Sequence, residues 1–133
     1  MDPTVHIGPM AREDLYANLE EQMKRLPQSW KVFWRREEMK KPFYPITLIE
    51  GSDEVFDEEL FGPVYTFFKA ENKEHAIQIA NTGSYGLGSS VYGKEGAEEV
   101  LDEIRAGMGF INSFTKSNFN FPAGGVGKSG YGR

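Results

Sequence analysis

The fold is decided by residues 64–112, which read VYTFFKAENKEHAIQIANTGSYGLGSSVYGKEGAEEVLDEIRAGMGFIN. In this stretch, short runs of β-branched and aromatic residues alternate with segments whose apolar residues recur at helical spacing. Strands that alternate with helices of about 10–13 residues favour βαβ crossovers and a largely parallel sheet. The expected order is strand 64–69, helix 72–81, strand 88–92, helix 94–106 and strand 108–112.

Two further elements precede this stretch, because residues 12–25 have the pattern of an amphipathic helix and residues 43–50 (FYPITLIE) that of a strand. Residues 26–41 leave two alternatives open, a strand with alternating faces or an irregular connector. Residues 82–88 are expected to form a glycine turn, and residues 113–133 show no regular period. The sequence therefore predicts an α/β fold, a largely parallel twisted sheet with covering helices.

The composition of the 133 residues excludes several classes of function. They carry 15 basic and 20 acidic side chains, a net charge of −5, and no cysteine. Without cysteine, this stretch can form no disulfide, no cysteine-ligated zinc site and no thiol nucleophile. The acidic balance argues against nucleic acid as a partner. With no apolar run of about 20 residues and no signal pattern at its start, the chain is expected to be cytoplasmic and to have no membrane partner.

Three weak patterns do not support a nucleotide-binding or metal-binding domain. Residues 125–130 (GVGKSG) match a dinucleotide fingerprint letter by letter, but no strand leads in and no helix leads out. The P-loop pattern would need glycine where Pro122 stands. His6 and His75 lack the spacing of metal ligands, and His75 is expected at the surface of a helix. A glycine-rich connector and no metal site are therefore predicted.

An acidic run, Asp57, Glu58 and Glu59, precedes the apolar residues of the strand at 64–69. Such runs usually form solvated loops, which is the expectation for the first two carboxylates. Glu59 differs because it stands beside Phe61 and close to the strand. A carboxylate there could accept hydrogen bonds from a pair of ligand hydroxyls, as acidic residues do with ribose. On the residues alone, both interpretations of Glu59 stay open.

The same segment, Glu58–Val64 (EELFGPV), resembles the E-E-x-F-G-P-V motif of NAD(P)-dependent aldehyde dehydrogenases. GPMAR near the start and SGYGR at the end most resemble the succinate-semialdehyde dehydrogenase group of that family. The resemblance implies that the fold is the C-terminal portion of an aldehyde dehydrogenase catalytic domain. Further segments agree in order, at residues 8–12, 76–81, 85–92, 107–112, 124–126 and 129–133.

The resemblance implies oxidation of an aldehyde, such as succinate semialdehyde, to the acid with hydride transfer to NAD or NADP. It implies that Glu59 binds the hydroxyls of the nicotinamide ribose and that Phe61 packs near the nicotinamide. Ser113 and Phe114 would border the substrate entrance. The family also implies a small-molecule aldehyde and further copies of the same chain, in a homo-oligomer, as partners.

The family's nucleophilic cysteine, general-base glutamate, oxyanion asparagine and Rossmann cofactor domain would all lie upstream of the matching segments. The resemblance therefore predicts a fragment: a single partial catalytic domain, residues 1–133, with no catalytic residue of its own. As an isolated chain it is expected to be inactive and to bind NAD or NADP weakly or not at all.

The chain departs from the family at two places. Ala123 stands where the family commonly has a phenylalanine beside the substrate funnel, and residues 26–42 lack a glycine-rich strand and turn. Reading the tryptophan codons of this segment one nucleotide later yields glycine. We therefore hypothesise that residues 27–36 are translated out of frame, which the coding DNA would test.

One alternative to an enzyme fragment is a non-enzymatic remnant that associates with itself or docks on a partner, because open sheet edges favour pairing between chains. The other alternative, an independent nucleotide-binding domain, rests only on the incomplete glycine motifs.

Overall fold

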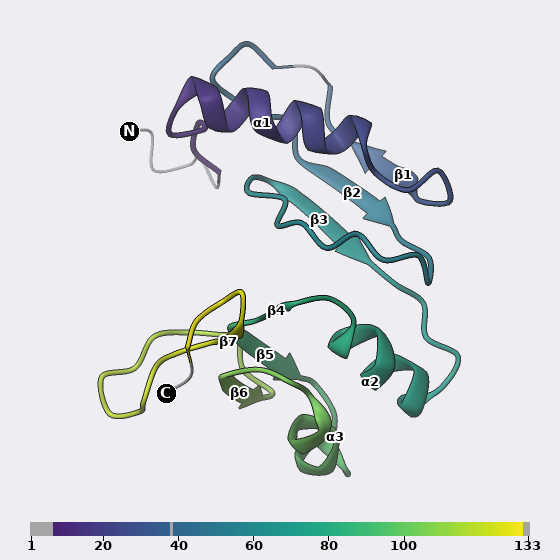
Figure 1. Cartoon of the computed structure of the whole chain (residues 1–133), viewed down its shortest axis with the longest axis vertical. Coiled ribbons are helices and arrows are strands. Elements are labelled where there is room, and N and C mark those ends of the chain that lie inside the picture. The colour runs from purple at the N-terminus through teal and green to yellow at the C-terminus, as the bar shows by residue number, and fades with distance from the viewer. Residues whose placement is uncertain (1–6, 38, 132–133) are drawn as a thin grey trace. The chain divides into compact units, whose positions relative to one another are not determined.

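The computed structural model describes residues 7–37 and 39–131. By their internal contacts they form two compact units, one within Met1–Lys69 and the other within Ala70–Arg133 (Figure 1). Both units combine helices with strands, which confirms the predicted α/β class. The described strands form three small sheets, in which two of the strand pairs are parallel and two are antiparallel.

The first unit packs helix α1 (Glu13–Lys24) along one side of a three-stranded sheet, as Figure 1 shows. The strands, in the order β1-β2-β3, are β1 (Lys31–Arg35), β2 (Thr47–Glu50) and β3 (Val64–Phe67). β2 and β3 run parallel although an acidic loop, and not a helix, connects them.

Strict alternation along β2 explains how this unit buries its core. Thr47 and Ile49 are fully buried, whereas Leu48 and Glu50 between and after them are half-buried. Ile49 joins Leu19 of α1, Tyr44 and Val64 of β3 in one apolar cluster. An amphipathic helix lying on the inward face of an alternating strand is the packing that the two sequence patterns require.

The strand alternative for residues 26–41 is confirmed, but its alternating faces are not. All five residues of β1, which is an edge strand of its sheet, are exposed. Its pairing with β2 is interrupted by a bulge between Val32 and Trp34. The extra residue, Phe33, stacks edge-on against Phe67 of β3, with 5.3 Å between ring centroids. A bulge shifts the side-chain alternation by one residue, which is why period two fails here.

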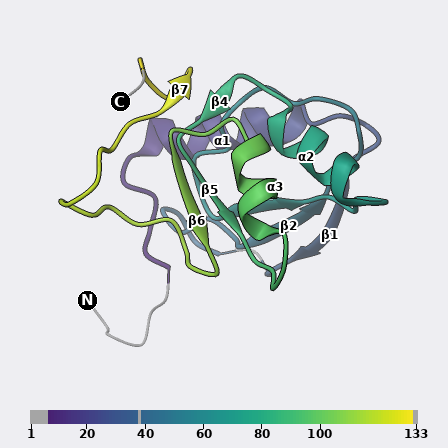
Figure 2. The same cartoon turned by 90° about the horizontal axis from the view of Figure 1, so that it is seen from below.

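The second unit holds α2 (Lys73–Asn81), β4 (Tyr85–Gly86), β5 (Gly88–Val91), α3 (Ala97–Glu103), β6 (Met108–Ile111) and β7 (Val126–Gly127). α3 crosses from β5 to β6, which are parallel, and packs against both strands (Figure 2). This is the predicted βαβ arrangement.

The residues that flank α2 and α3 explain where these two helices begin and end. The side chain of Asn72 accepts a hydrogen bond of 2.8 Å from the backbone N–H of His75, so α2 begins after a true N-cap as predicted. α3 is shorter than the predicted 94–106. It begins after Gly96, whose φ of 76° is left-handed, and ends before Ile104, whose backbone is extended.

Residues predicted as an irregular turn and tail contain two short strands, which corrects that part of the sequence analysis. β4 lies within the expected turn 82–88, and β7 lies within the aperiodic region 113–133. They pair antiparallel, Tyr85 with Gly127 and Gly86 with Val126. Across the parts of the chain that the structure describes, no helix is both long enough and apolar enough to cross a membrane.

Candidate functional site

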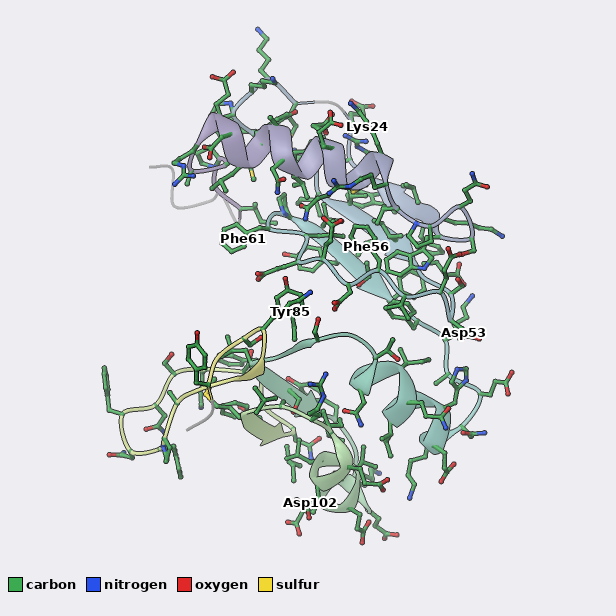
Figure 3. All side chains as sticks on the ribbon, viewed as in Figure 1. Lys24, Asp53, Phe56, Phe61, Tyr85 and Asp102 are labelled. Atoms are coloured by element: carbon green, nitrogen blue, oxygen red, sulfur yellow. The ribbon has the colours of Figure 1, made fainter. Side chains whose placement is uncertain are left out.

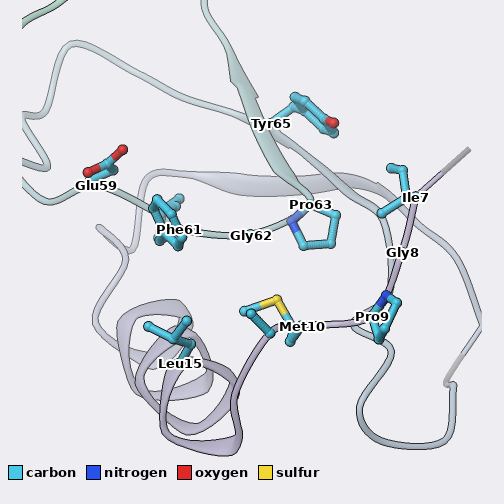
Figure 4. Close-up of a pocket in the computed structure, with 12 residues that line it drawn as sticks. Ile7, Gly8, Pro9, Met10, Leu15, Glu59, Phe61, Gly62, Pro63 and Tyr65 are labelled. Carbon is cyan, nitrogen blue, oxygen red and sulfur yellow. The ribbon is translucent and has the colours of Figure 1, made fainter.

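The first unit contains a cavity of about 580 Å³, a volume within the range of small-molecule sites. Figure 4 shows Phe61, Gly62 and Pro63 on one side of it and Gly8, Pro9 and Met10 on the other. The structure brings Glu59 and Phe61, the two residues predicted to contact a cofactor, into the lining of this one cavity. The other lining residues are Ile7, Ala11, Leu15, Leu60 and Tyr65.

Helix α1 holds the acidic end of this segment in place. The buried amide of Gln22 donates hydrogen bonds to the backbone carbonyl of Glu59 at 2.9 Å and to the Glu58 carboxylate at 3.1 Å. The guanidinium of Arg25 forms an ion pair with the same Glu58 carboxylate at 2.6 Å. Glu58 is therefore tied to the helix, whereas Glu59 is positioned through its backbone and keeps its own carboxylate free to act.

Gly62 allows the segment to lie close to the core. A Cβ at this position would stand 2.5 Å from Cδ2 of Leu19, which is fully buried and has no room to move aside. Two tight turns flank it: the N–H of Gly62 bonds to the carbonyl of Leu60 at 2.9 Å, and the N–H of Val64 bonds to the carbonyl of Gly62 at 2.8 Å. The Phe-Gly-Pro sequence thus folds the chain sharply and turns Phe61 outward (Figure 3).

Both predicted cofactor contacts are available to a ligand. Glu59 is exposed, and within residues 7–37 and 39–131 no hydrogen bond or ion pair to its carboxylate is found. The Phe61 side chain is 60% exposed. A free carboxylate can accept hydrogen bonds from two neighbouring hydroxyls, and an exposed ring beside it can pack on a planar heterocycle. This arrangement suits a ribose that carries an aromatic base.

The second unit has its own cavity, of about 320 Å³, between β6 and the loop at 113–123. Ser113, predicted at the substrate entrance, lines it, and so does Ala123. Phe114, the other predicted entrance residue, is not among the lining residues; its ring is 69% exposed and lies 5.7 Å from the Lys116 ammonium. The cofactor pair and the entrance pair thus belong to different units. Their functional roles stay predictions.

The glycine-rich segment 125–130 has a structural role. The Ser129 hydroxyl accepts a hydrogen bond from the backbone N–H of Gly86 at 3.0 Å, and the N–H of Lys128 bonds to the carbonyl of Ser84 at 2.8 Å. These bonds fasten β7 and the following turn to β4. The predicted connector is therefore partly a strand.

The structure describes only one of the two histidines, His75. His75 is half-buried at the start of α2, where its Nδ1 accepts a hydrogen bond from the backbone N–H of Glu71 at 3.3 Å. His6 lies outside the described residues. No group of three or more histidine, aspartate or glutamate side chains that could hold a metal ion occurs among the residues with a described placement.

Gln22, Lys116 and Asn118 belong to the two sites but were not singled out by the sequence. Gln22 acts on a segment 37 positions away, so its hydrogen-bond partners could not be predicted from the local sequence. Lys116 and Asn118 stand in a stretch without a regular apolar period. Only the cavity that this loop encloses identifies them as residues of a candidate site. A buried polar residue on the apolar face of α1 is the one signal that could have indicated Gln22.

Comparison with known proteins finds relatives that match the chain over nearly its whole length. The model of the aldehyde dehydrogenase family matches residues 1–133. Succinate-semialdehyde dehydrogenase [NADP(+)] 1 of Mycobacterium tuberculosis is 36% identical over 140 residues, which cover 99% of this chain and 31% of the relative. The chain therefore spans about a third of the length of the curated relatives that it matches.

Two solved structures are similar to this chain over its whole length. Succinic semialdehyde dehydrogenase of Streptococcus pyogenes, in complex with NADP+, superposes with a TM-score of 0.89 at 34% identity, over 100% of this chain and 31% of that one. A betaine aldehyde dehydrogenase of Staphylococcus aureus, in complex with NAD+, gives a TM-score of 0.88 at 28% identity, over 100% of this chain and 29% of that one.

Proposed function

Because this chain belongs to the aldehyde dehydrogenase family, we propose that it supplies the part of such an enzyme that holds the nicotinamide ribose and borders the substrate entrance. The single observation that carries the proposal is the cavity of the first unit. There the family's E-E-x-F-G-P-V segment presents an uncommitted Glu59 carboxylate and an exposed Phe61 ring side by side.

Each residue has a defined task in this proposal. Glu59 accepts hydrogen bonds from the two ribose hydroxyls and so fixes the rotation of the sugar. Phe61 packs against the nicotinamide and excludes water from it. A bound cofactor would supply the hydride acceptor for the oxidation of the aldehyde. Gln22 and Arg25 are positioning residues, because Gln22 holds the backbone carbonyl of Glu59 and Arg25 holds the carboxylate of the neighbouring Glu58.

We propose succinate semialdehyde as the substrate and NADP+ as the cofactor, on the likeness to the mycobacterial and streptococcal enzymes. The covalent step of the family requires a cysteine thiolate, and these 133 residues contain no cysteine. We therefore propose that the chain by itself neither oxidises aldehydes nor binds NADP+ tightly. Its contribution requires the catalytic parts to be supplied from elsewhere.

A chimera tests this proposal. The whole 133-residue chain replaces the matching third of the Mycobacterium tuberculosis enzyme, and NADPH formation from succinate semialdehyde is followed for the chimera, for the parent and for the isolated chain. The proposal expects turnover by the chimera and none by the isolated chain. Turnover by the isolated chain, or a folded chimera that binds NADP+ but has no turnover, would contradict it.

A second candidate function is self-association without catalysis, and the surface of the β1–β3 sheet favours it. Phe33, Trp34 and Tyr65 are 65%, 47% and 52% exposed, and β3, an edge strand of its sheet, reads VYTF without a charge. Uncharged edge strands with exposed aromatic residues favour pairing between chains. Sedimentation equilibrium of the isolated chain tests this candidate, which predicts dimers or larger species; a monomer at high concentration would contradict it.

A further inference from the structure

Asn112 stands where β6 ends and the segment 113–123, which lines the cavity of the second unit, begins. Its backbone N–H donates a hydrogen bond to the carbonyl of Val91 at 2.9 Å, directly after the last pair of the parallel β5–β6 register. Of the non-glycine residues that the structure describes, Asn112 alone has a left-handed backbone, with a φ of 50°. Residues in this conformation cluster at functional sites, where the surrounding structure holds them in place.

The side chain of Asn112 continues the pairing that its backbone gives up. Its Oδ1 accepts a hydrogen bond from the N–H of Gly93 at 3.0 Å, and its Nδ2 donates one to the carbonyl of Gly93 at 2.8 Å. One side chain therefore holds both backbone groups of Gly93, as a neighbouring strand would. This pair of bonds, called the clamp below, fixes the direction in which the chain leaves β6.

Asparagine meets both requirements of this position. It tolerates the left-handed region better than most residues that carry a Cβ, because its short polar side chain can bond to nearby backbone. Its amide carries a donor and an acceptor, whereas a carboxylate carries acceptors only. Glycine would adopt the same φ without strain but has no side chain to hold Gly93. Substitutions can therefore separate the effect of the clamp from the effect of backbone strain.

The path of the following segment depends on this clamp. Within the described chain, the hydrogen bonds found for residues 113–123 join this segment to itself and not to β6. Its first residue, Ser113, lines the cavity of about 320 Å³, and so do Phe121 and Ala123 near its other end. A change of direction at Asn112 would therefore change the shape of the cavity.

We infer that Asn112 is a positioning residue for the substrate entrance, because its clamp on Gly93 holds the segment 113–123 in the path that shapes the cavity. The inference rests on the proposed function, in which this segment borders the entrance. Asn112 is not among the lining residues, so it acts through the segment that it holds and not by touching a ligand.

Asn81 provides a matched control in the same unit. Its side chain also makes two hydrogen bonds to backbone, accepting one from the N–H of Arg105 at 2.7 Å and donating one to the carbonyl of Glu103 at 2.8 Å. Asn81 lies outside the cavity lining. Asn112→Ala and Asn81→Ala therefore remove the same kind of bonds, but only the first releases the entrance segment. Asn112→Gly removes the clamp without the strain that alanine would suffer.

Kinetics of the chimera give the first test. Asn112→Gly and Asn112→Ala should each raise the KM for succinate semialdehyde about tenfold, with kcat and the KM for NADP+ unchanged. Asn81→Ala should leave all three unchanged. A purely structural role would not single out the KM of one substrate. An unchanged KM for the aldehyde in Asn112→Gly, or the same change in Asn81→Ala, would overturn the inference.

Amide NMR of the isolated 133-residue chain gives a second test that needs no turnover. The backbone order parameters of residues 113–121 should fall below about 0.6 in Asn112→Gly and keep their parental values in Asn81→Ala. Parental values already this low, or no change in Asn112→Gly, would overturn the inference and leave the ribose site at Glu59 untouched. A chimera without turnover would instead refute the proposed function, and the NMR result would still decide whether the clamp holds the segment.

Discussion

Gly107 is a position in the second unit where a single added methyl group should be strongly destabilising. A Cβ at this position would stand 2.0 Å from the carbonyl oxygen of Gly124 and 2.9 Å from Cα of Gly125, whereas ordinary contacts begin at 3.4 Å. The obstacle is backbone, so one of the two segments must move by about 1.4 Å. Gly107→Ala should therefore separate the start of β6 from the segment before β7.

The size of the effect follows from what this displacement breaks. Overpacking a well-packed site costs about 1–3 kcal/mol. Displacing Gly107 also strains its own N–H bond to the Gly86 carbonyl, 3.1 Å long, whose loss adds about 1 kcal/mol. We expect a loss of about 3 kcal/mol in the free energy of unfolding of a unit whose whole stability is about 3–10 kcal/mol.

Urea unfolding, followed through the amide signals of β5 and β6, measures this loss. Gly93→Ala is the matched control in the same unit, because its Cβ would meet only Cβ of Ala97, at an ordinary 3.8 Å, and should cost less than about 0.5 kcal/mol. Equal stability of the two variants would refute the reasoning.

Two further predictions concern the first unit. Gln22→Leu removes the hydrogen bonds to Glu58 and to the Glu59 carbonyl, so hydrogen exchange of the Gly62 amide should quicken about five- to tenfold; an unchanged rate would show that α1 does not hold the segment. A hydrogen bond from Arg12 lowers the pKa of Asp14 from 3.8 to about 2, so the pair stabilises the fold above pH 3.8 and this contribution is lost as the pH falls towards 2. A carboxyl NMR titration should show the Asp14 pKa returning towards 3.8 in Arg12→Ala, and an unmoved pKa would contradict the cause assigned to it.

Much of the fold could be predicted because most elements carry their own period. The apolar spacing along α1 and α2 places each helix within a residue of its observed ends. α3 is shorter than its apolar pattern, because Gly96 is left-handed and periodicity does not register backbone conformation. β4 and β7 escaped prediction because two residues define no period. They form through hydrogen bonds between segments some 40 residues apart.

The residues of the candidate sites, too, could be predicted only where they belong to a local sequence pattern. Glu59 and Phe61 could be identified because they belong to a short contiguous motif with a recognisable order. Lys116 could not, since a lysine in an aperiodic loop has no pattern that separates it from a solvated surface residue. Only the loop's return over β6 gives that lysine an apolar cavity to face. Site residues that belong to a contiguous motif can therefore be predicted from the sequence. Isolated side chains can be assigned to a site only when the fold is known.

The central claim, that Glu59 holds the nicotinamide ribose, is tested most directly by the KM of the chimera for NADP+ with and without this carboxylate. Loss of charge-assisted hydrogen bonds to the hydroxyls should raise this KM about 10- to 100-fold in Glu59→Gln. Glu71→Gln, which alters an exposed carboxylate outside the cavity lining, should leave it unchanged. An active chimera whose KM for NADP+ is the same in Glu59→Gln as in its parent would contradict the claim.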